Sequence, residues 1–152
     1  MDSICRANMK DLTVTMEEVP EPYKGLGGRG LTSAIVHGEV PPTCHPLGPS
    51  NKLVIATGLL SGTTAPSSGR LSAGGKSPLT GTIKESNAGG TASAEISRLG
   101  IAAIVVENQP TDGALYTLVL TPDGAQLVSA DALKGMGNYD AVAKLTEDYG
   151  EK

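Results

Sequence analysis

Apolar and polar side chains alternate over residues 12–17, which is the period of a strand with one buried face, and Pro20 ends this segment. Two continuous apolar runs of strand length follow at residues 52–57 and 101–107. Runs of this length that lack polar positions are typical of strands covered on both faces. We therefore expect one half-buried and two buried strands.

A hairpin is indicated nearer the C-terminus, where residues 114–120 and 125–129 flank the turn Thr121-Pro-Asp-Gly124. Apolar residues at helical spacing predict three short helices, at residues 31–38, 91–99 and 139–149. Five apolar residues of the last two helices are expected to face the interior: Ala92, Ile96, Leu99, Val142 and Leu145. Strands and helices intermix along the chain, so the predicted class is α+β, with a mixed or antiparallel sheet and a few short helices.

Residues 58–90 differ from the rest because they are rich in Gly, Ser and Thr and poor in large apolar side chains. Such a segment cannot be held by burial of its own side chains, but it offers close backbone approach and many hydrogen-bonding groups. Its cations are Arg70, Lys76 and Lys84. We interpret it as a surface for a polar, phosphorylated ligand. The alternative, a flexible linker, is opposed by turn signals and by the β-capable piece 81–83.

Composition and charge argue against several classes of function. The 152 residues carry a formal net charge of −4, and a nucleic-acid-binding face would instead need a basic balance. The chain has no Phe and no Trp, so its core must be aliphatic. No apolar segment is long enough for a membrane span, and the N-terminus lacks the apolar region of a secretory signal. We expect a cytoplasmic protein with Cys5 and Cys44 as free thiols.

Several further motifs do not meet the requirements of the sites that they suggest. Gly25, Gly27 and Gly30 fit a dinucleotide-binding pattern, but proline-containing sequence precedes them where that motif needs a strand. Residues 69–77 resemble a phosphate-binding P-loop with one residue too many, and Pro78 bars the helix that should follow. Neither His37 nor His45 has a carboxylate or cysteine at ligand spacing, and no catalytic triad order is legible.

The chain resembles the N-terminal domain of the aldehyde ferredoxin oxidoreductase family over about residues 9–109. The resemblance rests on several sequence blocks that occur in the same order and spacing: Leu26-Gly-Gly-Arg-Gly-Leu31, Pro46-Leu47, Asn51-Lys52-Leu53, Ser61-Gly-Thr-Thr-Ala-Pro66, Gly69-Arg70, Lys76-Ser-Pro-Leu-Thr-Gly81, Ser86-Asn-Ala-Gly-Gly90 and Gly100. In that family this domain is the base on which a tungsten or molybdenum bis-pterin cofactor lies.

The resemblance implies roles for three cofactor-binding residues. Arg70 would contact the pterin or its phosphate, Asn87 would give an oxygen to the magnesium ion that bridges the two pterin phosphates, and Gly89 would contribute backbone contact. These chemistries agree with the residue types, because a guanidinium suits phosphate and Mg²⁺ prefers oxygen ligands. Lys76 is a second cation in the region, which we interpret as structural or peripheral.

The departures from the family are as informative as the matches. Family members are several times longer, their N-terminal domain has a second Gly/Arg-rich half, and later domains hold an iron–sulfur cluster. Two isolated cysteines cannot supply four thiolate ligands. We therefore expect residues 1–152 to form a single, partial cofactor-binding domain that is inactive alone: a truncated gene product, a separately encoded piece or a fragment.

Two hypotheses of different class follow. The first is the cofactor-cradling portion of an enzyme that oxidises aldehydes to carboxylates. Its partners would be the rest of the oxidoreductase or a companion subunit, with ferredoxin accepting electrons from the complete enzyme. The second is a non-catalytic binding module that keeps the fold without the cofactor. Without a second half, Ile104, Val106, Leu118 and Leu120 are expected to lack part of their cover, which would favour a homo-oligomer or aggregation.

Overall fold

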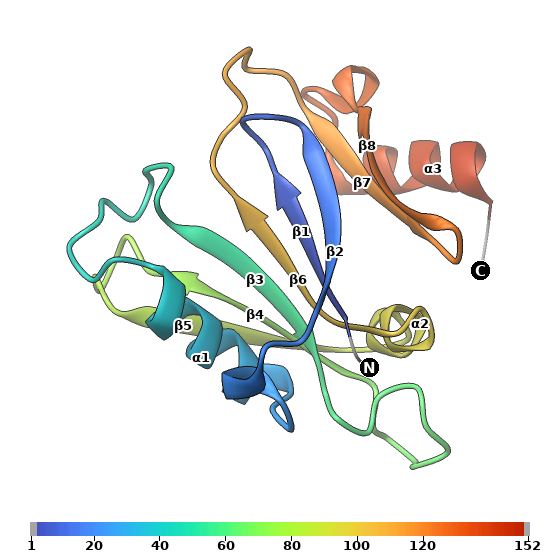
Figure 1. The fold of residues 1–152 in the computed structure, drawn as a ribbon. Helices are drawn as coiled ribbons and strands as arrows, with labels where there is room; N and C mark the ends of the chain where they lie inside the picture. Colours follow the sequence, from blue (N-terminus) through green and yellow to red (C-terminus); the bar gives the residue numbers. More distant parts are fainter. Residues whose placement is uncertain (1–2, 151–152) are drawn as a thin grey trace.

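The computed structural model describes residues 3–150, in which a six-stranded mixed sheet is flanked by helices and by a separate two-stranded sheet (Figure 1). The elements in chain order are β1 (Ser3–Asn8), β2 (Thr13–Glu18), a 3₁₀ turn (Glu21–Tyr23), α1 (Gly28–Glu39), β3 (Lys52–Thr57), β4 (Arg70–Lys76), β5 (Ile83–Gly89), α2 (Ala92–Arg98), β6 (Ile101–Glu107), β7 (Tyr116–Thr121), β8 (Gly124–Ser129), a second 3₁₀ turn (Asp131–Leu133) and α3 (Asn138–Tyr149). The predicted α+β class is confirmed.

The large sheet has the strand order β2-β1-β6-β3-β4-β5. The pair β1–β6 is parallel, whereas the other neighbouring pairs of this sheet run antiparallel. The two buried strands predicted from continuous apolar runs, β3 and β6, lie side by side in the middle. Strands β4 and β5 extend the sheet to one edge, so the segment 58–90 contributes two sheet strands and is not a flexible linker.

Helix α1 covers one face of this sheet. Its residues Leu31, Ile35 and Val36 recur at helical spacing and are buried against Ile4 and Val54 of the sheet, which explains why this segment is helical. The helix crosses β4 closely because Gly74 has no side chain: a Cβ there would lie 2.9 Å from Cβ of Thr32. The helix therefore lies close over β4, with β3 and β5 on either side.

The opposite face is covered by α2 and the β7–β8 hairpin. Cys5, Ile101 and Ile104 form the buried centre of this smaller cluster, with Ile96 and Leu99 of α2 packed against it. Gly100 follows α2 at φ 78°, the left-handed conformation that ends helices and suits glycine. The predicted hairpin is confirmed, with Thr121 opposite Gly124.

Some local predictions were wrong. Strand β1 was not predicted, although it is an interior strand of the sheet, because its Arg6 and Asn8 interrupt the apolar pattern. Leu12 lies outside β2, in the connecting turn, at φ 55°. Helix α1 begins at Gly28, three residues before the predicted start. In each case pairing or packing with distant residues outweighed local sequence preference.

Two predicted orientations were also wrong. Ala92 is exposed, and the buried positions of α2 are Ser93 and Ser97, whose hydroxyls are hydrogen-bonded. Val142 is 62% exposed, and no residue of α3 is buried. Of the four strand residues expected to lack cover, Ile104 is buried and the others are partly buried: Val106, Leu118 and Leu120. None of the helices formed by residues 3–150 is long and apolar enough to cross a membrane.

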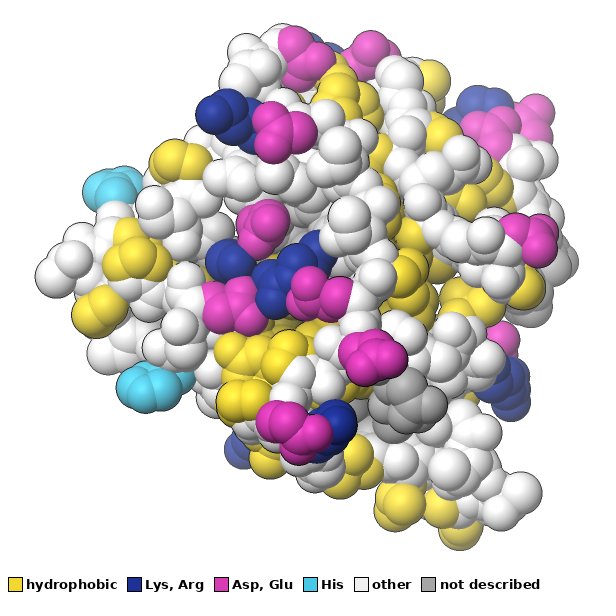
Figure 2. Space-filling model, in the orientation of Figure 1, with side chains coloured by type: hydrophobic (Ala, Val, Ile, Leu, Met, Phe, Trp, Pro, Cys, Tyr) yellow, Lys and Arg dark blue, Asp and Glu magenta, His cyan; other side chains and the backbone are white. Residues whose placement is uncertain are grey.

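The C-terminal end of α1 is held by an ion-pair network, seen as the compact group of basic and acidic side chains near the middle of the face in Figure 2. Glu39 accepts two hydrogen bonds of 2.8 Å from Arg6 and a third, also 2.8 Å, from Lys52. Arg6 also binds Glu17, and Lys52 also binds Glu107. The network joins α1 to four strands.

This network makes stability depend on acid pH. Burial alone would raise the pKa of the Glu39 carboxyl, but hydrogen bonds from Arg6 and Lys52 outweigh it and hold the pKa at about 2, below the ordinary value of 4.5. A carboxyl with a lowered folded-state pKa stabilises the fold above its unfolded pKa and loses that contribution as the pH falls. We expect the difference in unfolding free energy between the wild type and Glu39→Gln to shrink as the pH falls from 4.5 towards 2. Urea titrations at a series of pH values measure it, and a constant difference would contradict the prediction.

Candidate functional site

Glycine-bearing segments from three parts of the chain meet at one end of the sheet, next to the start of α1. A Cβ on Gly27 would lie 2.8 Å from the backbone N of Leu59, and a Cβ on Gly69 would lie 2.5 Å from the backbone O of Gly90. The N–H of Gly58 donates to the carbonyl of Arg70 at 3.0 Å. The close approaches at Gly27 and Gly69 are possible only because glycine has no side chain, so these glycines serve backbone packing at this end.

The residues predicted to bind cofactor lie together here. In the β4–β5 register Arg70 is opposite Gly89, and Ser72 is opposite Asn87. Alternate residues of a strand share a face and paired residues point to the same side, so all four lie on one face. It is the face that α1 covers, because a Cβ on Gly28 of that helix would lie 3.5 Å from Oγ of Ser72.

Arg70 combines a fixed backbone with a free side chain. Its carbonyl oxygen lies 2.6 Å from Oγ of Ser93 and also accepts the Gly58 N–H. Its guanidinium is exposed and makes no hydrogen bond or ion pair with any residue in 3–150. Because the backbone of Arg70 is held in place and its guanidinium has no partner among these residues, the guanidinium is available to bind an anion.

Asn87 is oriented by a neighbour that sequence reasoning missed. Oγ of the buried Ser72 donates to Oδ1 of Asn87 at 2.8 Å. The amide oxygen has two lone pairs, so one remains for a further partner, and oxygen is the ligand that Mg²⁺ prefers. Ser72 could be found only from the strand register, since fifteen residues separate it from Asn87.

The family model described as aldehyde ferredoxin oxidoreductase, N-terminal domain, matches residues 4–152. The chain belongs to this family.

Relatives within the aldehyde ferredoxin oxidoreductase family are named tungsten-containing aldehyde ferredoxin oxidoreductases. The Pyrococcus furiosus protein is 45% identical over 106 residues, which cover 68% of this chain and 18% of that protein. The Thermococcus kodakarensis protein is 37% identical over 147 residues, which cover 95% of this chain and 24% of that protein. This chain therefore spans about a quarter of the length of the latter.

The fold recurs in a solved structure, the BamBC active-site complex of benzoyl coenzyme A reductase with 1,5-dienoyl-CoA. The TM-score is 0.89 at 26% identity, and the match covers 97% of this chain and 22% of that one. The likeness therefore confirms that nearly the whole chain has the architecture of an aldehyde ferredoxin oxidoreductase N-terminal domain.

The donor set on the β4–β5 face fits the family's cofactor. The exposed guanidinium of Arg70 suits a phosphate, the amide oxygen of Asn87 suits a hard cation, and a Cβ on Gly89 would meet nothing within 4 Å. The same side of the sheet therefore offers a cation, an oxygen ligand and open space. Within the described part of the chain, no group of three or more His, Cys, Asp or Glu side chains is placed to hold a metal ion.

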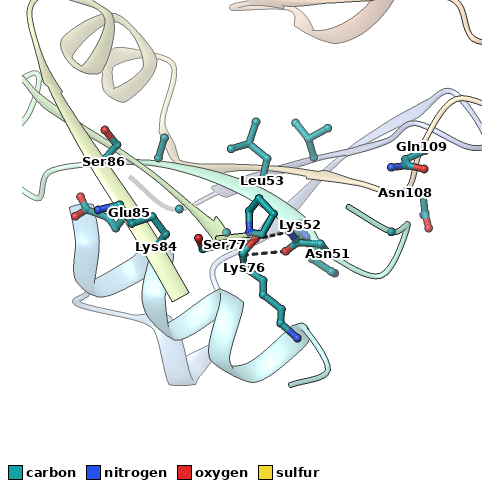
Figure 3. A pocket seen from close by; sticks show the side chains of 16 residues that line it. Asn51, Lys52, Leu53, Lys76, Ser77, Lys84, Glu85, Ser86, Asn108 and Gln109 are labelled. Carbon is teal, nitrogen blue, oxygen red and sulfur yellow. Dashed lines mark hydrogen bonds between the residues drawn. The ribbon is translucent and has the colours of Figure 1, made fainter. Parts of the chain in front are cut away.

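Lys76 is separated from this group. It lies at the other end of β4, where its Nζ donates to the carbonyl oxygens of Pro42 and Cys44 at 2.5 and 2.7 Å. Asn51 adds hydrogen bonds to the backbone N and O of Lys76, drawn as dashed lines in Figure 3. Lys76 therefore closes the proline-rich connection before β3, as its structural interpretation anticipated.

A separate hollow of about 410 Å³ lies beside Lys76 (Figure 3). Leu53 and Ser86 point into it from the sheet face opposite α1, and Asn108 and Gln109 close its far side. None of Arg70, Asn87 and Gly89 lines it. Lys84 also lines this hollow and makes no ion pair with any residue in 3–150. We assign the candidate site to the α1 side because Arg70, Asn87 and Gly89 lie together there.

Proposed function

We propose that this chain is the cofactor-cradling N-terminal portion of a tungsten or molybdenum pterin-dependent oxidoreductase that oxidises aldehydes to carboxylates with ferredoxin as electron acceptor. The observation that carries the proposal is the placement of Arg70, Asn87 and Gly89 side by side on one sheet face, with the Arg70 guanidinium unpaired. Family membership supports it, since relatives bear the name of that enzyme.

In this proposal the residues position the cofactor and balance its charge. Arg70 would bind a phosphate or a pterin edge, Asn87 would give its amide oxygen to the cofactor's magnesium ion, and Gly89 would let the backbone come close. When bound, the metal–pterin supplies the two-electron redox chemistry. The chain's own role is to orient the group and to keep Arg70 and Asn87 preorganised through Ser93 and Ser72.

We assign the iron–sulfur cluster to another part of the enzyme. An iron–sulfur cluster needs four cysteine thiolates, and this chain has only Cys5, which is buried, and Cys44. We therefore propose that residues 1–152 form one partial domain, inactive alone, which works in the cytoplasm with the rest of the oxidoreductase or a companion subunit that carries the cluster. Ferredoxin would be the partner of the complete enzyme.

Cofactor loading tests the proposal. The chain is co-expressed with the remainder of such an enzyme in a host that makes the cofactor, and the purified complex is analysed for tungsten and for fluorescent pterin. Arg70→Ala and Asn87→Ala are each expected to lower cofactor content roughly tenfold under limiting cofactor, because each removes a charge-assisted or metal-directed contact. Arg98→Ala, an exposed arginine on α2, is the matched control and should load like the wild type.

Two results would contradict it. Full loading of both variants would show that these residues do not hold the cofactor. A wild-type chain that folds and joins the complex without any cofactor would favour the second hypothesis, a non-catalytic module that retains the fold.

A further inference from the structure

A second arginine lies close to the candidate site and has not been given a role. Arg29, in the first turn of α1, has its Nε 3.6 Å from Oε2 of Glu85 on β5. The two side chains differ sharply in exposure, since 74% of Arg29 is accessible to solvent and 16% of Glu85. The carboxylate is therefore packed under the helix, while the guanidinium extends outwards.

This pair is poorly explained as a stabilising contact. Oε1 of Glu85 is buried and has no hydrogen-bond partner among residues 3–150, and an unpaired buried acceptor costs free energy. Arg29 places a positive charge in the first turn of a helix, where the dipole favours negative charge, and that turn contains no acidic residue. Both groups are thus held in positions that the fold by itself does not favour.

The pair adjoins Asn87. Glu85 and Asn87 are two residues apart on β5 and point to the same side, the side on which Gly74 and Ser72 face α1. Along β5 the order is Glu85 with Arg29, then Asn87, then Gly89 with Arg70 opposite. Glu85, which contacts Arg29, and Gly89, which is opposite Arg70, therefore lie on either side of Asn87, roughly 13 Å apart along the strand.

We propose that Arg29 is a further anion-binding residue of this face and that Glu85 is a positioning residue that holds the Arg29 guanidinium beside Asn87. The ligand class is a diphosphate or a pair of phosphate groups with a divalent cation between them. Two arginines that flank one amide oxygen match two anionic groups that share a central cation. This inference rests on the proposed function, because it extends the same site.

The probe is magnesium pyrophosphate, titrated into the full chain at low ionic strength by isothermal titration calorimetry. The wild type is expected to bind at millimolar concentrations or below, and Arg29→Ala is expected to weaken binding roughly tenfold. Arg98→Ala is the matched control, because Arg98 is also exposed, is paired with Glu95, and lies on the helix that covers the opposite face of the sheet. It should change affinity by less than about twofold.

The variant Glu85→Gln distinguishes a positioning role of Glu85 from a purely electrostatic effect of its negative charge. Removal of a nearby negative charge would by itself strengthen the binding of an anion. If Glu85 orients Arg29, binding should instead weaken, by roughly threefold to tenfold, and the substitution should have no weakening effect when Arg29 is already alanine. Circular dichroism and thermal unfolding of each variant confirm that the fold is retained.

The outcomes separate this inference from the proposed function. Tighter binding by Glu85→Gln, or unchanged binding by Arg29→Ala, overturns the roles of these two residues. If Arg70→Ala and Asn87→Ala still lower cofactor loading, the proposed function stands without them. Absence of pyrophosphate binding by the wild type overturns the diphosphate site, whereas cofactor loading of the complex continues to test the proposed function.

Discussion

Glu39→Gln is expected to lower the unfolding free energy at neutral pH by about 2–4 kcal/mol, because it removes one partner from a mostly buried ion-pair network. The carboxylate accepts three hydrogen bonds from Arg6 and Lys52, and Tyr23 lies at 3.3 Å. An amide cannot accept all of these with the same strength, and it leaves the two cations with less compensation. Since Glu39 ends α1, the loss falls on the contact between the helix and the sheet.

Glu95→Gln is the matched control for this result. Glu95 pairs with Arg98 on the exposed surface of α2, so its loss should cost less than about 0.5 kcal/mol. Urea unfolding with an unchanged dependence on denaturant measures both values. If Glu39→Gln were no more destabilising than Glu95→Gln, the network would not be what holds α1 in place.

Gly69→Ala is expected to destabilise the chain by about 2–3 kcal/mol and to abolish pyrophosphate binding, because the new methyl group would lie 2.5 Å from the backbone O of Gly90. The obstacle is backbone and cannot rotate away. The two segments must therefore separate, and they are the ones that lead into Arg70 and out of Gly89. Urea unfolding and calorimetry on the same variant measure the two effects.

Gly89→Ala is the counterpart of this substitution at a site twenty residues along the chain. A Cβ on Gly89 would meet nothing within 4 Å, and its backbone conformation is open to other residues. The variant should therefore be as stable as the wild type or up to about 1 kcal/mol more stable. A fold that is intact but loads less cofactor would support a close backbone contact at Gly89, whereas equal instability of the two variants would contradict the steric explanation of Gly69.

The comparison of these two glycines shows what residue type alone can reveal. A segment rich in glycine predicts close approach somewhere, but it does not show which glycine is approached by protein and which faces open space. Gly69 meets Gly90, Gly74 meets Thr32, and Gly89 meets nothing. These differences depend on strand pairing and on the position of α1, and hence on residues far apart in the chain.

The candidate site likewise combines residues that the sequence identified with residues that only the structure identified. Motif blocks in family order pointed to Arg70, Asn87 and Gly89, and the structure brings the three together. Their supporting residues are Ser72 in the serine-rich segment and Ser93 in α2, and nothing local distinguishes either from exposed neighbours. Burial and hydrogen bonding decided their roles.

The order of apolar and polar residues determined where β3, β6, the β7–β8 hairpin and most of the helices form, because period, turn residues and helix ends act over a few neighbours. It also determined the family. Only the tertiary structure decided that Ser3–Asn8 is an interior strand of the sheet, that Val142 faces solvent, and that Arg29 contacts Glu85 near Asn87. The physical reason is that burial and strand register are set by partners distant in sequence, whose contacts outweigh local preference.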